Sequence, residues 1–107
     1  MGFLNVHART EFDAEKMKKI GLFATEHMFC DQYCLEPGQS QKVHAHDAAT
    51  KLYYVLDGAI EATVGEETRT LQAGDLAFAE PGEIHGITNR SNARARVLVV
   101  MGPNPNF

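Results

Sequence analysis

The feature that most constrains the fold of this chain is a succession of short apolar or alternating runs, each closed by a turn signal. These signals recur throughout the chain from His27 onward. They are Pro37-Gly38, Asp57-Gly58, Gly65-Glu66, Ala73-Gly74-Asp75, Pro81-Gly82 and the segment from Asn89 to Asn92. Because many short strands separated by such turns are typical of sandwiches and barrels, the pattern predicts an all-β fold of antiparallel sheets.

The apolar runs between the turns are the expected strands. They cover residues 27–35, 42–47, 51–56, 59–64, 67–71, 76–79, 84–88 and 94–101. Asp57-Gly58 is the strongest hairpin signal, because glycine tolerates the positive φ of a tight primed turn. Ahead of these runs, the segment from Glu11 to Lys19 mixes charged residues with Phe12 and Met17. We expect it to form one short helix or an irregular arm.

Length and composition indicate one domain that does not bind nucleic acid or membranes. The chain has 107 residues, of which 44% are hydrophobic, enough for a single core over residues 1–107. Its net charge of -4 provides no basic field for nucleic acid or an anionic membrane. The longest apolar run, Val97 to Met101, is too short to span a bilayer, and the N-terminus lacks the pattern of a signal peptide. We therefore expect a cytoplasmic protein.

The two cysteines, Cys30 and Cys34, are expected to be reduced. On one strand they lie about 13 Å apart, because each residue advances about 3.3 Å, and a disulfide requires Cα atoms within about 7 Å. We expect two half-buried thiols; the alternative is a thiol that lines a pocket.

Two of the five histidines, His44 and His46, are separated by one residue. Side chains alternate faces along a strand, so both imidazoles point the same way, with Cβ atoms about 6.5 to 7 Å apart. That separation allows both rings to reach one ion at about 2.1 Å from each nitrogen. A third ligand has to come from elsewhere, and His85, which follows a Pro-Gly turn, is the candidate.

Two segments of the chain resemble the two motifs of the cupin family. Residues 38–58 are similar to the first motif through Gly38, His44, His46 and Gly58, and residues 74–89 are similar to the second through Gly74, Gly82, His85 and Asn89. The resemblance covers the chain from about residue 25 to 103. It implies a jelly-roll barrel, the double-stranded β-helix of two antiparallel sheets, with His44, His46 and His85 as ligands of a divalent metal inside it.

The chain departs from the family pattern at two positions. Glu80 stands where proline is common, with Pro81 one residue later, which alters a turn. More important, Lys51 occupies the position of the family's glutamate ligand. Alternation along the strand turns Lys51 inward with Tyr53 and Val55. An ammonium about 4 Å from a divalent ion is repelled by roughly 8 kcal/mol at an effective dielectric constant of 20. Both therefore cannot remain charged and close together.

Three arrangements resolve this conflict. In the first, Lys51 turns away to a carboxylate or to solvent and leaves a three-histidine metal site with open positions, a ligand set known in some cupin-like dioxygenases. In the second, no metal binds, and the histidines and Lys51 form a cationic pocket for an anion such as a carboxylate or sugar acid. In the third, a neutral Lys51 acts as an amine nucleophile or base.

Other residues are expected around the site. Those on the same face of neighbouring strands are Tyr53, Ile60, Ala62, Phe78 and Ile87. Most of them form core, but the Tyr53 phenol is a second catalytic candidate beside Lys51, because it can hold or protonate a bound molecule. Asn89 and Asp75 are expected to support turns.

The resemblance implies a small-molecule metalloenzyme, oxygenase-like or isomerase-like, with iron, zinc, nickel or manganese as its cofactor. The alternative is a binding module for a small anion. We also expect a homodimer, because outward-facing apolar residues such as Val43, Leu52 and Leu98 need covering.

Overall fold

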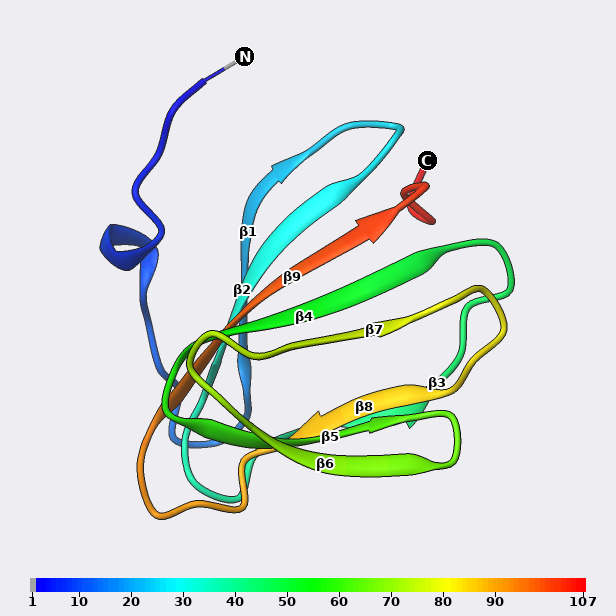
Figure 1. Cartoon of the computed structure of the whole chain (residues 1–107). Coiled ribbons are helices and arrows are strands. Elements are labelled where there is room, and N and C mark those ends of the chain that lie inside the picture. Colours follow the sequence, from blue (N-terminus) through cyan, green and yellow to red (C-terminus); the bar gives the residue numbers. More distant parts are fainter. Residues whose placement is uncertain (1) are drawn as a thin grey trace.

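The computed structural model describes residues 2–107, and the strands of this region form two antiparallel sheets (Figure 1). In chain order the elements are η1 (His7–Arg9), β1 (Lys18–Ala24), β2 (Phe29–Leu35), β3 (Ser40–His44), β4 (Thr50–Asp57), β5 (Ala59–Val64), β6 (Glu67–Gln72), β7 (Leu76–Ala79), β8 (His85–Thr88) and β9 (Ala95–Gly102). One sheet has the order β1-β2-β9-β4-β7 and the other β3-β8-β5-β6. The predicted all-β jelly-roll class is therefore confirmed.

The core lies between the two sheets. It consists of Tyr33, Leu35, Tyr53, Val55, Ile60, Ala62, Ile87, Ala95, Val97 and Val99, and these residues come from both sheets. The inward direction expected for Tyr53, Ile60, Ala62 and Ile87 is confirmed. Burying the inner faces of both sheets provides the main driving force for this fold.

The segment from Glu11 to Lys19 contains no helix, so the helical alternative was wrong. Residues 10–17 are an irregular arm, and β1, which was not expected, begins at Lys18. Its mixed sequence gives little strand signal, and pairing with β2 holds it in place. Gln32 fixes the segment that precedes this arm, because its side-chain amide donates to the carbonyl oxygens of Val6 and Arg9 over 3.1 and 2.9 Å.

Asp57-Gly58 is not a hairpin, which corrects the strongest turn prediction. The flanking strands belong to different sheets, because β4 pairs with β7 and β9 whereas β5 pairs with β6 and β8. Gly58 has a φ of +77°, and a Cβ there would lie 2.4 Å from the carbonyl oxygen of Arg94. The glycine therefore permits a tight corner between sheets, a use that the dipeptide alone does not distinguish from a hairpin.

Phe78 faces outward, contrary to expectation, and is 58% exposed. It pairs with Leu52 and so shares its outer face, whereas Ala77 pairs with Tyr53 and faces the core. The large interior side chains of β4 leave room for only small residues opposite, so alanine occupies the inward positions of β7.

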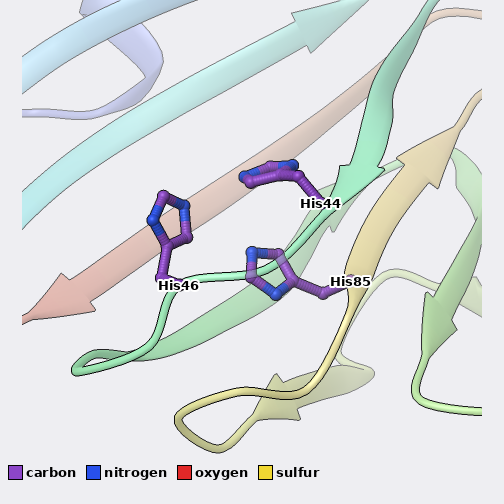
Figure 2. Close-up of side chains that lie close together, drawn as sticks. All are labelled: His44, His46 and His85. Atoms are coloured by element: carbon purple, nitrogen blue, oxygen red, sulfur yellow. The ribbon is translucent and has the colours of Figure 1, made fainter.

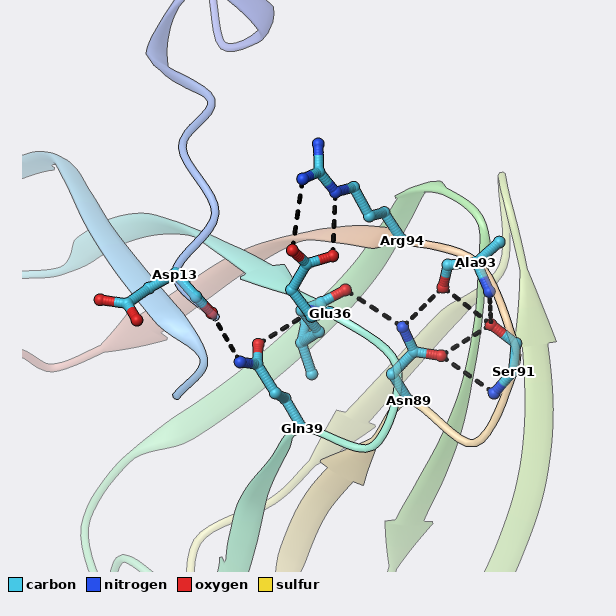
Figure 3. Close-up of polar contacts among 8 residues, drawn as sticks. Asp13, Glu36, Gln39, Asn89, Ser91, Ala93 and Arg94 are labelled. Carbon is cyan, nitrogen blue, oxygen red and sulfur yellow. Dashed lines mark hydrogen bonds and ion pairs between the residues drawn. The ribbon is translucent and has the colours of Figure 1, made fainter. Parts of the chain in front are cut away.

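Asn89 and Asp75 support turns, as expected. The Asn89 amide donates to the carbonyl oxygens of Leu35 and Ala93 over 3.1 and 2.8 Å, and its oxygen accepts from the Ser91 backbone N–H (Figure 3). Asp75 accepts a bond from the backbone N–H of Gln72 over 2.9 Å. Asn89 is fully buried, so these bonds fix the turn between β8 and β9 to the end of β2.

Both cysteines are free, as expected. Their side chains are buried, whereas the sequence predicted half-buried thiols. Cys30 is 7% exposed and Cys34 is fully buried. Their partners on β9, Val100 and Arg96, lie on the outer face of the larger sheet.

Candidate metal centre

Strand pairing brings the three histidines together. His44 is the last residue of β3, His85 is the first residue of β8, and the two are direct partners in the ladder. His46 lies two residues beyond the end of β3, because the strand covers Ser40–His44 and ends earlier than predicted. Its loop is held by a 2.8 Å bond from the Gly82 backbone N–H to the His46 carbonyl oxygen.

The three imidazoles form one compact cluster (Figure 2). The ring centroid of His44 lies 4.8 Å from that of His46 and 4.6 Å from that of His85, and the other pair is 5.5 Å apart. One ring nitrogen from each histidine lies within 4.8 Å of the others. The sequence prediction that these three residues converge is therefore met.

Backbone carbonyls fix which nitrogen of two rings faces the cluster. Nδ1 of His44 lies 2.7 Å from the Lys42 carbonyl oxygen, and Nδ1 of His85 lies 3.0 Å from that of Glu83. A carbonyl only accepts, so each Nδ1 carries the proton and each Nε2 keeps a free lone pair. Nε2 of His85 is buried and has no hydrogen-bond partner among the described residues.

Burial keeps the imidazoles of His46 and His85 in the form that a metal requires. Burial lowers the pKa of His85 to about 4, and the positive charge of Lys51 adds to the effect. Burial likewise lowers the pKa of His46, helped by the charges of His44 and Lys51 and opposed by Asp47. Both rings are therefore neutral at pH 7, and a neutral imidazole is the species that binds a metal ion.

The family follows from a match that includes this cluster. Residues 32–101 match the family model described as the cupin domain. The chain is a cupin. The protein TT1209 of Thermus thermophilus, known from a crystal structure, is 43% identical to this cupin, with a TM-score of 0.95, and the match covers 98% of this chain and 100% of that one.

Two curated relatives match part of this cupin. The tetracenomycin polyketide synthase protein TcmJ of Streptomyces glaucescens is 33% identical over 69 residues, which cover 64% of this chain and 46% of that protein. The oxalate-binding protein of Thermotoga maritima is 33% identical over 67 residues, which cover 63% of this chain and 55% of that protein. The match thus spans about half the length of these relatives.

Lys51 remains inside the barrel of this cupin. It is 2% exposed, and Nζ donates to Oε1 of Gln41 over 3.2 Å and to the hydroxyl oxygen of Tyr33 over 3.4 Å. None of the ion pairs among residues 2–107 includes Lys51. The expectation that Lys51 turns away to solvent or to a carboxylate is therefore wrong, because two neutral side chains hold its ammonium in the interior.

The charge of Lys51 is only partly stabilised there. Burial, together with the charge of Lys19, lowers its pKa from 10.5 to about 8, although Asp31 acts in the opposite direction. At pH 7 the amine is still mostly protonated. Nζ also lies 5.5 Å and 5.3 Å from the ring centroids of Tyr33 and Tyr53, where the aromatic faces stabilise a cation.

Tyr53 lies between the lysine and the histidines. It is fully buried, its ring centroid is 6.2 Å from that of His85, and its hydroxyl donates to Oε1 of Gln41. Burial raises its pKa, so the phenol stays protonated. Its proton is already engaged by Gln41, which orients the hydroxyl.

Sequence reasoning missed Gln41 and Tyr33. Nε2 of Gln41 donates to the Tyr33 hydroxyl over 2.9 Å, so the two residues form one buried polar cluster with Lys51 and Tyr53. The register of β3 shifts between Gln41 and His44, so residues three apart both reach the interior. A polar residue just before the His-x-His pair was the available signal, and strict alternation concealed it.

A pocket of about 750 Å³ opens beside His46. Its walls come from the turn between β1 and β2, the loop after β3 and the segment after β9. Its polar residues include Glu26, Asp47 and Asn104, and Phe107 adds an apolar surface. The pocket provides room for a small molecule next to the histidine cluster.

No helix within residues 2–107 has the length and apolar character needed to cross a membrane.

Proposed function

We propose that this cupin binds one divalent transition metal through a ring nitrogen of each of His44, His46 and His85. The observation that carries the proposal is Nε2 of His85, a buried acceptor with no partner among the described residues. Such an orphaned atom is costly, and a metal ion would satisfy it. The hydrogen bonds from Nδ1 of His44 and His85 to backbone carbonyls are those that usually orient metal-binding imidazoles.

The three histidine nitrogens suit a divalent transition metal. In a tetrahedral site with bonds of about 2.1 Å, ligand nitrogens are about 3.4 Å apart. The three nitrogens already lie within 4.8 Å of one another, so side-chain rotations suffice to close the site. Three neutral ligands suit iron, zinc, nickel or manganese. When bound, the ion would supply Lewis acidity toward an oxygen atom of a small molecule.

We propose a small polar or carbonyl-bearing molecule as the substrate, and metal-assisted oxygenation or isomerisation as the class of reaction. The pocket beside His46 admits the molecule, and the core around His85 excludes water from one side of the site. Oε1 of Gln41 accepts from both the Tyr53 hydroxyl and Nζ of Lys51, so it orients the two side chains. The fold itself supports many chemistries, so the site residues alone carry this part of the proposal.

The second candidate is a metal-free binding module for a small anion. The observation in its favour is the buried ammonium of Lys51, which lacks a carboxylate partner among the described residues. Against it stands the neutral state of His46 and His85 at pH 7, which follows from their lowered pKa values. Neither His46 nor His85 then supplies a positive charge for an anion.

Metal analysis of untagged protein distinguishes the two functions. The protein is loaded in turn with iron, zinc, nickel and manganese, desalted and analysed for bound metal. We expect about one equivalent of at least one ion per chain, and its loss in His85→Gln and His44→Ala. His27→Ala is the matched control, because His27 is an exposed histidine paired with Glu26. Wild-type protein that retains no stoichiometric metal would exclude the metal site.

We further propose a homodimer. Leu52 and Leu98 lie on the outer face of the larger sheet beside Phe78, whereas Val43 lies on β3 in the other sheet. The three residues chosen from the sequence therefore do not form one surface, and the larger sheet is the better interface. A cytoplasmic location and the lack of a nucleic-acid partner remain predictions from the sequence.

A further inference from the structure

The buried ammonium of Lys51 is left with hydrogen-bond partners that other groups already use. Oε1 of Gln41 accepts from both Lys51 and the Tyr53 hydroxyl. The hydroxyl oxygen of Tyr33 accepts from both Lys51 and Nε2 of Gln41. Charge-assisted bonds from an ammonium are usually about 2.7 to 2.9 Å long, and both bonds of Lys51 are longer, at 3.2 and 3.4 Å.

The charges around Lys51 do not neutralise it. Asp31 acts on Lys51 from the inner face of β2, but it forms no ion pair with it, and the charge of Lys19 opposes that effect. The acidic side chains that line the pocket, Glu26 and Asp47, form no ion pair with Lys51. Burying a charge without a counter-charge costs free energy. A function that uses the charge would account for its presence in the interior.

The ammonium also lies within electrostatic reach of the histidines. The charge of Lys51 contributes to the lowered pKa values of both His46 and His85. Tyr53 borders both groups, with its ring centroid 5.3 Å from Nζ of Lys51 and 6.2 Å from the His85 centroid. Lys51 is therefore separated from the histidine cluster by a single side chain, that of Tyr53.

We infer that Lys51 selects a carboxylate-bearing molecule for the site by binding its carboxylate group. The inference rests on the proposed metal function, since the same molecule would offer a second oxygen to the ion. A carboxylate is planar and small, and it presents acceptor oxygens that Nζ can use in place of the shared oxygens of Gln41 and Tyr33.

The test compares each acid with its uncharged amide. Pyruvate and lactate are titrated against pyruvamide and lactamide into zinc-loaded protein, and binding is followed by NMR chemical shifts. We expect the acids to bind at least about tenfold more tightly than their amides, because a charge-assisted bond in a buried site is lost with the amide. Lys51→Met should remove this preference while the protein still binds zinc.

Lys19→Met is the matched control. Nζ of Lys19 lies 5.4 Å from the same Tyr33 ring, but Lys19 is exposed, so its removal should leave the preference unchanged. Lys51→Gln replaces Lys51→Met if the methionine variant does not fold, as judged by circular dichroism.

Zinc content, measured on every sample, separates the two proposals. Protein that fails to bind zinc but still prefers acids through Lys51 would contradict the metal function and support the role of Lys51. Zinc-loaded protein that binds acids and amides equally, or that binds no acid at millimolar concentration, would overturn the inference. Retention of the preference in Lys51→Met or Lys51→Gln would overturn it as well.

Discussion

Lys51 is the residue at which this cupin departs from the glutamate ligand of the first motif. A side chain that is 2% exposed carries an amine where the resemblance leads one to expect a carboxylate. The interior tolerates it because Gln41 and Tyr33 accept its hydrogen bonds and two aromatic rings face it. We therefore expect this position to affect both how tightly a metal binds and which molecules bind beside it.

Lys51→Glu should strengthen metal binding. The substitution removes a repelling charge and adds an oxygen ligand, so we expect affinity for zinc or manganese to rise at least about tenfold. Competition with a chromophoric chelator measures it. Lys51→Gln removes the charge without adding a carboxylate ligand and separates the two effects. A glutamate variant that binds metal no better than the glutamine variant would show that residue 51 cannot reach the ion.

Lys51 should also make the free energy of unfolding depend on pH. Its pKa falls from 10.5 to about 8 on folding, so between these values the unfolded chain binds more protons than the folded one. The contribution of Lys51 to the free energy of unfolding therefore rises with pH across that window. Below pH 8, burial of the protonated amine lowers the free energy of unfolding by about 3 kcal/mol.

Urea unfolding of wild type and Lys51→Met at several pH values tests this. The raised pKa values of Tyr33 and Tyr53 act in the opposite sense at high pH, so the difference between the two proteins is the informative quantity. We expect the advantage of the methionine variant to be largest below pH 8 and to shrink toward pH 10.5. A constant difference would mean that Lys51 folds with an ordinary pKa.

The sequence predicted the histidines but not the environment of Lys51, and the reason is physical. The spacing of His44 and His46 suggests a pair of ligands, and the resemblance to the cupin motifs adds His85. The partners of Lys51 come from two other strands, and the register shift before His44 turns Gln41 inward against the alternation rule. Side-chain acceptors of this kind depend on packing between strands, which spacing along the chain does not specify.

At the scale of elements, the sequence predicted most strands but not how they connect. The segment around Asp57-Gly58 has a turn signal that fits a hairpin and a corner equally well, and the structure uses it as a corner between sheets. The true two-residue hairpin is at Gly65-Glu66, between β5 and β6. β1 was missed because its stability comes from its partner strand and not from its own composition.

Gly58→Ala should destabilise the protein far more than Gly74→Ala. Both glycines have positive φ, +77° and +92°, so alanine is strained at each by about 1 to 2 kcal/mol. Only at Gly58 would the new Cβ also meet backbone, 2.4 Å from the Arg94 carbonyl oxygen, whereas nothing lies within 4 Å at Gly74. Urea unfolding measures the free energy of unfolding of both variants. Equal losses of stability in the two would show that crowding at this corner adds no cost.

At the scale of the whole molecule, the outer face of the larger sheet is the surface most in need of a partner. Phe78, Leu52 and Val100 form one cross-strand row, and Leu76, Tyr54 and Leu98 form the next. Phe78, Leu76 and Tyr54 are 58%, 50% and 37% exposed. Apolar rows of this kind that reach an edge strand favour association.

Phe78→Asp should therefore convert the proposed dimer to a monomer. A charge in an apolar interface is not solvated, so the dissociation constant should rise by at least about a hundredfold. Sedimentation velocity at micromolar concentration measures it. Val43→Asp, which alters an exposed residue of the other sheet, is the control and should leave the dimer intact. A wild-type monomer at these concentrations would exclude this interface.

Anomalous X-ray diffraction from crystals of the zinc-loaded protein tests directly whether the three histidines bind one metal ion. We expect one strong peak inside the barrel, about 2.1 Å from a ring nitrogen of each of His44, His46 and His85, with Nε2 as the donor of His44 and His85. Crystals with zinc only at surface residues, or with His85 Nε2 bonded to an ordered water and no ion near it, would contradict it.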